Sequence, residues 1–269
     1  MSVALSDLFS RRRKEPPDFD AGDAPAHPTK VLERFVGSLA ARDQPVLLDL
    51  GPVVGSNVSF FGEQLGCKIF VEDITKDIDR HVREGKLDAL ADALSSRFPQ
   101  ESDSIDGILC WDVFDYLDRK PARSLAVQLA RVLKPDGVLL AFFSTTQPQP
   151  GMRPEYTRHV VVSPTALEFR PCPAARGRQR PLPNRDIQLL FEPLRVADQF
   201  LLLTNRREVL LRKKPATPDA EIPSTDTEVS SIDSEVPSID SEVSSIDTEV
   251  SSTETEVSST DTEPPSTER

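Results

Sequence analysis

The chain has 269 residues, of which 38% are hydrophobic, and a formal net charge of −12; this is enough apolar sequence for one folded core. The charge is concentrated in residues 215–269, which hold 15 acidic residues and one basic residue, whereas residues 1–214 hold 29 acidic and 31 basic residues. A nearly neutral folded part argues against binding to nucleic acid or to a membrane surface, and the sequence gives no sign of export or membrane insertion, so we expect a cytoplasmic protein.

Both ends of the chain are predicted to be disordered, around a single domain formed by residues 29–214. Residues 1–28 are rich in charge, Pro and Ala and have no periodicity. Residues 215–269 are an acidic low-complexity tail in which a seven-residue unit such as EVSSIDT repeats from Glu221. The Val and Ile positions imitate the spacing of a coiled coil, but the Ser, Thr and Pro content and the unbalanced acidic charge disfavour a helix.

The first half of the domain alternates between helical and strand patterns. Residues 46–50 (VLLDL) form a short apolar run that ends at a glycine-bearing turn, which is typical of a strand buried on both faces in a parallel sheet. Apolar residues at helical or strand spacing surround this run. The pattern predicts a helix from Thr29 to about residue 39, strands at 46–50, 68–71 and 87–90, and helices at 57–65 and 78–85.

The second half continues the alternation and then changes to hairpins. A strand at 105–110, a helix at 122–133, a type I turn at 134–137 and a strand at 137–143 follow one another. An insertion at 144–183, rich in Pro and Arg, contains a predicted hairpin of residues 158–163 and 166–170. Asn184 is expected to cap a short helix, and residues 196–204 and 208–212 to form the last hairpin.

The segment LDLGPVVGS, residues 48–56, is the most informative for function. Glycines at the end of a strand let a ligand approach the backbone, and the following helix offers free N–H groups. Gly55 and Glu72 are 17 positions apart, which places a carboxylate at the end of the neighbouring strand, where it can accept the hydroxyl protons of a ribose. These features predict a nucleotide-like cofactor. The three cysteines lack the paired spacing of a metal site, so no metal is expected.

Six blocks of sequence follow one another in a recognisable order: LDLGPVVG, FVED, ADAL, IDGILCWDVFDYL, LARVLKPDGVLLAFF and VADQFLLLTNRREVLLRK. In this order and spacing they resemble the class I S-adenosylmethionine-dependent methyltransferases, over about residues 31–213. The first four resemble the family's glycine motif, the acidic end of strand two, the acidic position beside the adenine and the strand-four motif. The fifth block is the most specific, because it resembles the family's helix, R-x-L-K-P-G-G turn and fifth strand. The sixth resembles the closing antiparallel pair.

This resemblance implies an α/β fold with a doubly wound, mostly parallel, seven-stranded sheet and S-adenosylmethionine as the cofactor. Val53 stands where the family usually has its middle glycine, and a branched side chain there narrows the approach to the methionine part of the cofactor. If the acceptor must lose a proton, Asp112 and Tyr116 are the candidate catalytic residues, with His159 as a third. The cofactor-binding residues that the resemblance assigns are Asp49, Gly51, Gly55, Glu72, Asp73, Asp92 and Trp111.

Two other functions stay open beside methyl transfer. A nicotinamide oxidoreductase is disfavoured, because the Y-x-x-x-K pair at Tyr116 follows the fourth strand and GPVVGS lacks the spacing of a dinucleotide loop. A catalytically inactive methyltransferase-like domain that serves as a binding or scaffold module is favoured by Val53. The methyl acceptor is expected to be a small molecule rather than nucleic acid, and the sequence does not predict an oligomeric state.

The arginines of the insertion have three interpretations. They could cover a substrate at the carboxyl edge of the sheet, form a solvated basic loop, or attract the acidic tail in a salt-sensitive way. The residues concerned are Arg170, Arg176, Arg178, Arg180 and Arg185.

Overall fold

The computed structural model describes residues 3–4, 25–149, 151–202 and 204–215. The predicted N-terminal arm, residues 1–28, lies mostly outside these ranges, and the repeat tail, residues 215–269, lies outside them except for its first residue. Disorder of both segments therefore stays a prediction. Within the described ranges, no helix is long and apolar enough to cross a membrane.

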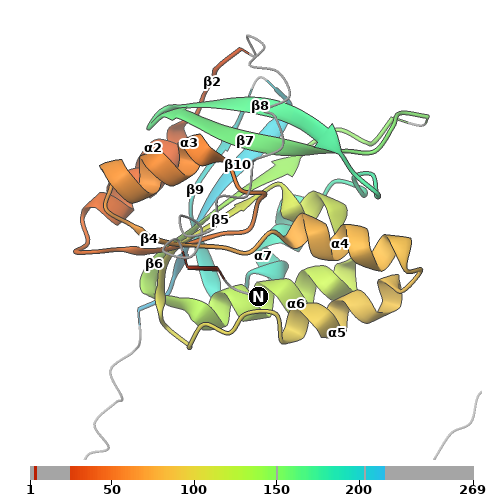
Figure 1. Cartoon of the computed structure of the whole chain (residues 1–269), viewed down its shortest axis with the longest axis horizontal. Coiled ribbons are helices and arrows are strands. Elements are labelled where there is room, and N and C mark those ends of the chain that lie inside the picture. Colours follow the sequence, from red (N-terminus) through yellow and green to blue (C-terminus); the bar gives the residue numbers. More distant parts are fainter. Residues whose placement is uncertain (1–2, 5–24, 150, 203, 216–269) are drawn as a thin grey trace, which may run out of the picture. The chain divides into compact units, whose positions relative to one another are not determined.

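A mixed sheet forms the centre of the described domain (Figure 1). Its central four strands are parallel, and their apolar residues are buried or partly buried on both faces, as the apolar runs predict, while the strands at either side run antiparallel to their neighbours. The α/β class and the doubly wound sheet are confirmed. In the described residues the seven strands lie in the order β1 (Val3–Ala4), β4 (Lys68–Val71), β3 (Val46–Asp49), β5 (Ile105–Trp111), β6 (Leu133–Ser144), β10 (Arg206–Lys213) and β9 (Leu194–Leu201).

Helices cover both faces of this sheet, because successive strand residues point to opposite sides. On one face, Leu47, Leu109 and Leu140 pack with α2 (Lys30–Ala40) and with the π-helix η1 (Ser59–Gln64), which continues α3 (Gly55–Val58). On the other face, Leu48, Ile108 and Leu139 belong to the larger core cluster. The helices of that second face are α4 (Ile74–Arg83), α5 (Leu90–Ser95), α6 (Arg119–Val132) and α7 (Asn184–Leu190).

The predicted helix at Thr29 forms as the sequence indicates. The Thr29 hydroxyl accepts a hydrogen bond from the Leu32 backbone N–H at 3.3 Å, which caps the first turn of α2. The apolar residues that recur at helical spacing along α2 are all buried against the sheet. Local capping and apolar periodicity therefore agree at this helix.

The insertion folds as a hairpin that extends the domain beyond the main sheet. Strands β7 (Glu155–Ser163) and β8 (Ala166–Pro173) pair antiparallel, and β2 (His27–Pro28) adds to β8 as a third strand. Figure 1 shows this hairpin across the end of the sheet, beside α2 and α3. The predicted hairpin of residues 158–163 and 166–170 is confirmed, and so is the closing hairpin formed by β9 and β10.

Three local predictions were wrong. Residues 87–90 form no strand, because the 3₁₀ helix η2 (Leu87–Ala89) runs into α5, where Leu90 and Leu94 are buried at helical spacing. Residues 134–137 do not form a type I turn, since they lie in β6 and Asp136 has φ 59°, where that turn requires a φ near −90°. Asn184 does not cap α7, because the cap residue is Pro183.

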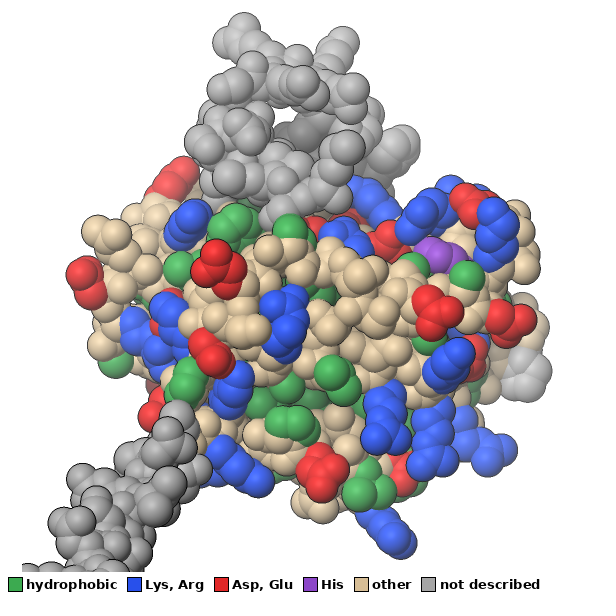
Figure 2. All heavy atoms as spheres, turned by 90° about the horizontal axis from the view of Figure 1, so that it is seen from below, with side chains coloured by type: hydrophobic (Ala, Val, Ile, Leu, Met, Phe, Trp, Pro, Cys, Tyr) green, Lys and Arg blue, Asp and Glu red, His purple; other side chains and the backbone are tan. Residues whose placement is uncertain are grey.

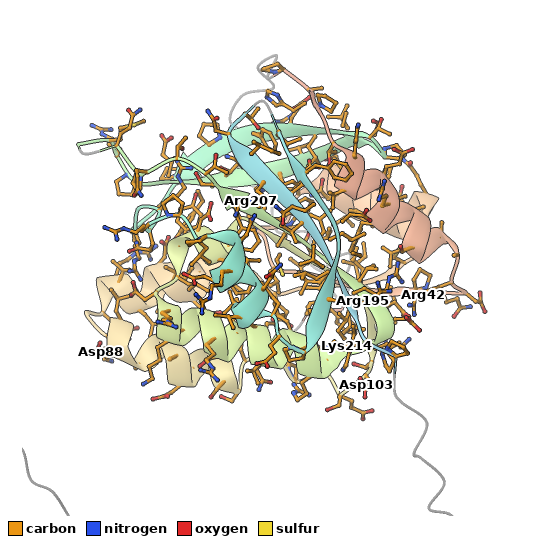
Figure 3. The ribbon with its side chains drawn as sticks, turned by 180° about the vertical axis from the view of Figure 1, so that it is seen from behind. Arg42, Asp88, Asp103, Arg195, Arg207 and Lys214 are labelled. Carbon is orange, nitrogen blue, oxygen red and sulfur yellow. The ribbon has the colours of Figure 1, made fainter. Side chains whose placement is uncertain are left out.

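The two ends of the sheet differ in their charged groups. Figure 3 shows Arg207 at the start of β10, at one end, and Arg42, Arg195 and Asp103 at the other. At that second end the charges pair internally: Arg42 and Lys134 both bind the buried Asp106. On the face shown in Figure 2, basic and acidic side chains are interspersed without one continuous basic patch, in line with the nearly neutral composition of residues 1–214.

Candidate cofactor and acceptor sites

Asp49 lies at the carboxyl end of β3, where the glycine segment begins. Its side chain is buried, and its Oδ1 accepts hydrogen bonds from the Gly51 backbone N–H at 2.9 Å and from the Trp111 indole N–H at 2.7 Å. Burial raises the pKa of Asp49 to about 6, and these two hydrogen bonds oppose that shift. Asp49 is therefore a carboxylate that the chain's own donors already hold in place.

Trp111 fills the space beside Gly51. β5 is irregular between Leu109 and Trp111, and Trp111 has φ 51°, a left-handed conformation that is rare for a bulky residue. Its ring stacks on His159 with a centroid distance of 4.9 Å. A Cβ on Gly51 would lie 2.7 Å from Trp111 Cδ1, so only glycine fits next to this indole. The glycine thus makes room for a side chain of the same domain.

Glu72, at the end of β4, is also engaged by the chain itself. Its carboxylate is buried, and Oε2 accepts a hydrogen bond from Arg97 at 2.6 Å. Arg97 binds Asp77 as well, at 2.8 Å. Burial alone would lower the pKa of Arg97, but its contacts with Asp77 and Glu72 outweigh burial and raise the pKa. The Glu72 backbone N–H donates to the Asp49 carbonyl at 2.8 Å, so the two strand ends adjoin. Glu72 is thus a buried ion-pair partner.

The remaining predicted cofactor residues differ in how they relate to Asp49 and Glu72. Asp73 precedes α4, where its carboxylate binds Thr75 and Lys76, and its charge helps to raise the pKa of Asp49. Gly55 begins α3, and a Cβ there would meet nothing within 4 Å. Asp92 is exposed in the first turn of α5, and no contact among the described residues joins it to Asp49 or Glu72. Val53 is 45% exposed, so its side chain is not buried with those of Asp49 and Trp111.

Asp112 belongs to a second cluster, directly after Trp111. It is buried, and Oδ2 lies 3.6 Å from an Arg206 nitrogen, while Oδ1 lies 4.0 Å from His159 Nδ1. Burial raises the pKa of Asp112, and the charge of Arg206 opposes the shift. Arg206 also lies 3.1 Å from His159 Nε2. Since a guanidinium only donates hydrogen bonds, His159 Nε2 must accept this one. Burial and the charge of Arg206 lower the pKa of His159 well below 6.5, so the imidazole ring is neutral.

Tyr116 lies in the short 3₁₀ helix η3 (Val113–Tyr116), which follows β5. The side chain is buried, and its hydroxyl donates to the Glu155 carbonyl at 2.9 Å. Burial raises the pKa of Tyr116, and the carboxylates of Asp112 and Asp115 add to that shift. The phenol is therefore a neutral hydrogen-bonding group.

A cavity of about 400 Å³ opens beside Tyr116 at the carboxyl ends of β5 and β6. Its walls come from the loop after β6, from the hairpin β7–β8 and from the turn between β9 and β10. A cavity of this size suits a small molecule. The polar and charged residues that line it include Tyr116, Ser144, Thr157, Arg178 and Arg206. We call this space the Ser144 cavity.

Sequence reasoning missed Arg97, which binds Glu72, and Arg206, which faces Asp112. Arg97 lies in a segment with sparse apolar residues, and Arg206 begins the last strand of a hairpin, so nothing in the local pattern distinguishes either from a solvated arginine. Within the described ranges, no group of three or more His, Cys, Asp and Glu side chains could hold a metal ion.

Comparison with known proteins finds a similarity in the central part of the domain. Residues 48–141, which include Asp49, Glu72 and Trp111, match a family model described as a methyltransferase domain. No curated protein matches the chain.

Solved structures that resemble the fold include the PH0226 protein of Pyrococcus horikoshii OT3, with 16% identity, a TM-score of 0.40 and coverage of 69% of this chain and 92% of that one. A Burkholderia thailandensis 1,6-didemethyltoxoflavin-N1-methyltransferase with bound S-adenosylhomocysteine has 13% identity, a TM-score of 0.42 and coverage of 69% and 77%. An Aquifex aeolicus SAM dependent methyltransferase has 14% identity, a TM-score of 0.38 and coverage of 68% and 89%. The family model covers about a third of the chain, so the comparisons show that residues 48–141 are similar to a methyltransferase domain.

Proposed function

We propose that this chain transfers a methyl group from S-adenosylmethionine to a small-molecule acceptor that binds in the Ser144 cavity. One observation carries the proposal: a continuous series of contacts connects the glycine segment with the cavity wall. Asp49 binds the Trp111 indole, Trp111 stacks on His159, and His159 accepts a hydrogen bond from Arg206. The two halves of a two-substrate site would therefore adjoin at the carboxyl edge of the sheet, where open α/β sheets bind ligands.

The residues fit the cofactor only after two side chains move. Asp49 and Glu72, the carboxylates expected to hold the cofactor, are occupied by Trp111 and Arg97. The Gly51 backbone is covered by the same indole. Once both side chains are displaced, Asp49, Gly51 and Glu72 would hold the cofactor, whose sulfonium supplies an already activated methyl group. The protein's contribution would then be mainly alignment of the acceptor.

On the acceptor side, Tyr116 and Asp112 have different proposed roles. Tyr116 lines the cavity, and its hydroxyl proton is held by the Glu155 carbonyl, so we propose that the side chain forms part of the wall that contacts an acceptor. Asp112 does not line the cavity, and it acts through Arg206, whose guanidinium it faces at 3.6 Å. Asp112 is therefore proposed as a positioning residue and Tyr116 as the residue that touches the acceptor.

A second candidate function is a ligand-binding module that does not transfer methyl groups. The observation that favours it is that Trp111 and Arg97 occupy the two carboxylates on which cofactor binding depends. In this case the Ser144 cavity would bind its ligand without S-adenosylmethionine. The fold alone does not separate the two functions.

Isothermal titration calorimetry of the full chain with S-adenosylmethionine distinguishes the candidates. Methyl transfer requires saturable binding, and Gly51→Val should abolish it, because the added side chain collides with Trp111 and closes the site further. Gly37→Ala, on the exposed side of α2, is the matched control: a Cβ there meets nothing within 4 Å, so binding should persist. Circular dichroism establishes that both variants fold. Absence of binding to the wild-type chain at millimolar cofactor would reject methyl transfer and leave the ligand-binding module.

A further inference from the structure

The Ser144 cavity has two arginines fixed in its wall. Arg178 donates to the Ser144 hydroxyl at 2.7 Å, and Arg206 donates to the Thr157 hydroxyl at 2.9 Å. The guanidinium carbon of Arg206 also lies 4.5 Å from the centre of the Phe169 ring, a cation–π contact that holds the group against one face. Both arginines are thus ordered before any ligand arrives, which lowers the entropy cost of binding.

These arginines retain donors that could face a ligand. A guanidinium has five N–H groups in a planar fork. Among the described contacts, Arg178 uses one nitrogen on Ser144, and Arg206 uses its two terminal nitrogens on His159, Asp112 and Thr157. Both side chains line the cavity. The geometry suits a planar or tetrahedral anion, which such a fork binds through paired hydrogen bonds.

The buried carboxylates behind the cavity only partly balance this positive charge. Asp112 lies 3.6 Å from Arg206, beyond hydrogen-bond distance. Asp115 accepts from the Ser144 backbone N–H at 2.8 Å rather than from an arginine. Burial raises the pKa of Asp112, and it raises the pKa of Asp115 to about 7, so Asp115 carries only part of its negative charge near neutral pH.

We infer that the Ser144 cavity binds a small molecule through an anionic group, a carboxylate or a phosphate, that pairs with Arg178 and Arg206. The volume of about 400 Å³ accommodates a ring or short chain beside that group. Phe169, which also lines the cavity, supplies an apolar surface. That this ligand is the methyl acceptor rests on the proposed function, whereas the binding itself does not.

The test uses the full chain, without cofactor, in calorimetric titrations with four probes of similar shape. Benzoate and phenyl phosphate carry the anion, and benzamide and benzyl alcohol are their neutral counterparts. At least one anion should bind, and neither neutral probe should bind. The anion that binds more tightly shows whether the ligand's anionic group is a carboxylate or a phosphate. Arg178→Gln should weaken the anion's affinity at least about tenfold, which corresponds to 1.4 kcal/mol. Arg178→Lys should retain part of it.

Arg123→Gln, on the exposed surface of α6, is the matched charge control and should bind as the wild type does. Arg206→Gln is a second test. Because Arg206 also faces buried Asp112, circular dichroism must show that this variant folds, and if it does not fold, the result with Arg178→Gln alone decides. Equal binding of neutral and anionic probes, no binding of any probe, or unchanged affinity in Arg178→Gln would overturn the inference. Anion binding in a chain that does not bind S-adenosylmethionine would uphold the inference and reject methyl transfer.

Discussion

The indole N–H of Trp111 donates a 2.7 Å hydrogen bond to the buried carboxylate of Asp49 and so joins the end of β5 to the end of β3. A tryptophan at φ 51° is held against a backbone preference that costs on the order of 1–3 kcal/mol. The hydrogen bond and the stacking on His159 and Phe142 offset this cost. Because the same indole covers Gly51, any ligand of the glycine segment competes with the contacts that join β3 to β5.

The first prediction tests whether Trp111 blocks S-adenosylmethionine from the glycine segment or contacts it directly. Trp111→Ala should raise the affinity for S-adenosylmethionine about tenfold, because it frees both Asp49 and the space beside Gly51. The cavity it leaves should lower the free energy of unfolding by about 3–5 kcal/mol. Calorimetric titration and urea denaturation measure the two effects.

Trp111→Phe is the companion variant, since it keeps a ring beside Gly51 but removes the indole N–H. Its affinity for S-adenosylmethionine should stay near the wild-type value, and it should lose about 1 kcal/mol of stability with the hydrogen bond. Weaker cofactor binding in Trp111→Ala would show instead that the indole contacts the cofactor directly.

The second prediction concerns the ion pair of Arg97 and Glu72. Glu72 has a fully buried side chain, so Arg97→Met would leave an uncompensated carboxylate and should lower the free energy of unfolding by about 3 kcal/mol. Adding Glu72→Gln to Arg97→Met should restore much of that loss, because the buried charge of Glu72 is gone while Asp77 keeps its ion pair with Arg80. Urea denaturation of the wild type, both single variants and the double variant gives the coupling energy; additive effects would contradict a direct ion pair.

The sequence predicted the elements in which local pattern and burial agree. The strands at 46–50 and 68–71 were readable because strands buried on both faces are continuously apolar, and α2 was readable from its cap and its stripe. Residues 87–90 were misread because Leu87 and Leu90 suit either a short strand or a helix. Only the packing of Leu90 and Leu94 against the core settled the choice.

The candidate site was predictable only in part. The sequence pointed to Asp49, Gly51 and Glu72, because glycines and acids after strands have few purely local explanations. It could not show that Trp111 and Arg97 bind those carboxylates, since both contacts join residues 25 or more positions apart. The Ser144 cavity is likewise assembled from segments between Tyr116 and Arg206 that only the tertiary fold brings together.

The third prediction concerns the acidic repeat tail, which lies outside the described residues. Its low hydrophobicity and high acidic charge predict that it adds nothing to the folded core. A chain truncated after Lys214 should therefore keep the melting temperature of the full chain. A decrease of several degrees, equivalent to about 1 kcal/mol for a domain of this size, would contradict the prediction; differential scanning calorimetry makes the comparison.

The fourth prediction follows from the carboxyl group of Asp115, which burial and the nearby charge of Asp112 hold at a pKa of about 7 instead of 3.8. Below about pH 4 this group is protonated in both the folded and the unfolded chain. As the pH rises from about 4 to 7, the unfolded chain releases the proton while the folded chain keeps it, so the free energy of unfolding falls. Above pH 7 the group changes stability no further. Asp49, with a pKa of about 6, acts in the same direction.

Asp115→Asn removes this titration but keeps a carbonyl oxygen that can accept from the Ser144 backbone N–H. The wild type should lose more stability than Asp115→Asn between about pH 5 and pH 7.5, by at least about 1 kcal/mol, since one pKa unit corresponds to 1.36 kcal/mol. Asp88→Asn is the control, because Asp88 is exposed on the helical layer (Figure 3) and should leave the pH dependence unchanged. Urea denaturation at both pH values measures the difference. Identical pH profiles for the wild type and Asp115→Asn would mean that Asp115 is ionised across this range, and Asp115 would then add a full negative charge behind Arg178 and Arg206.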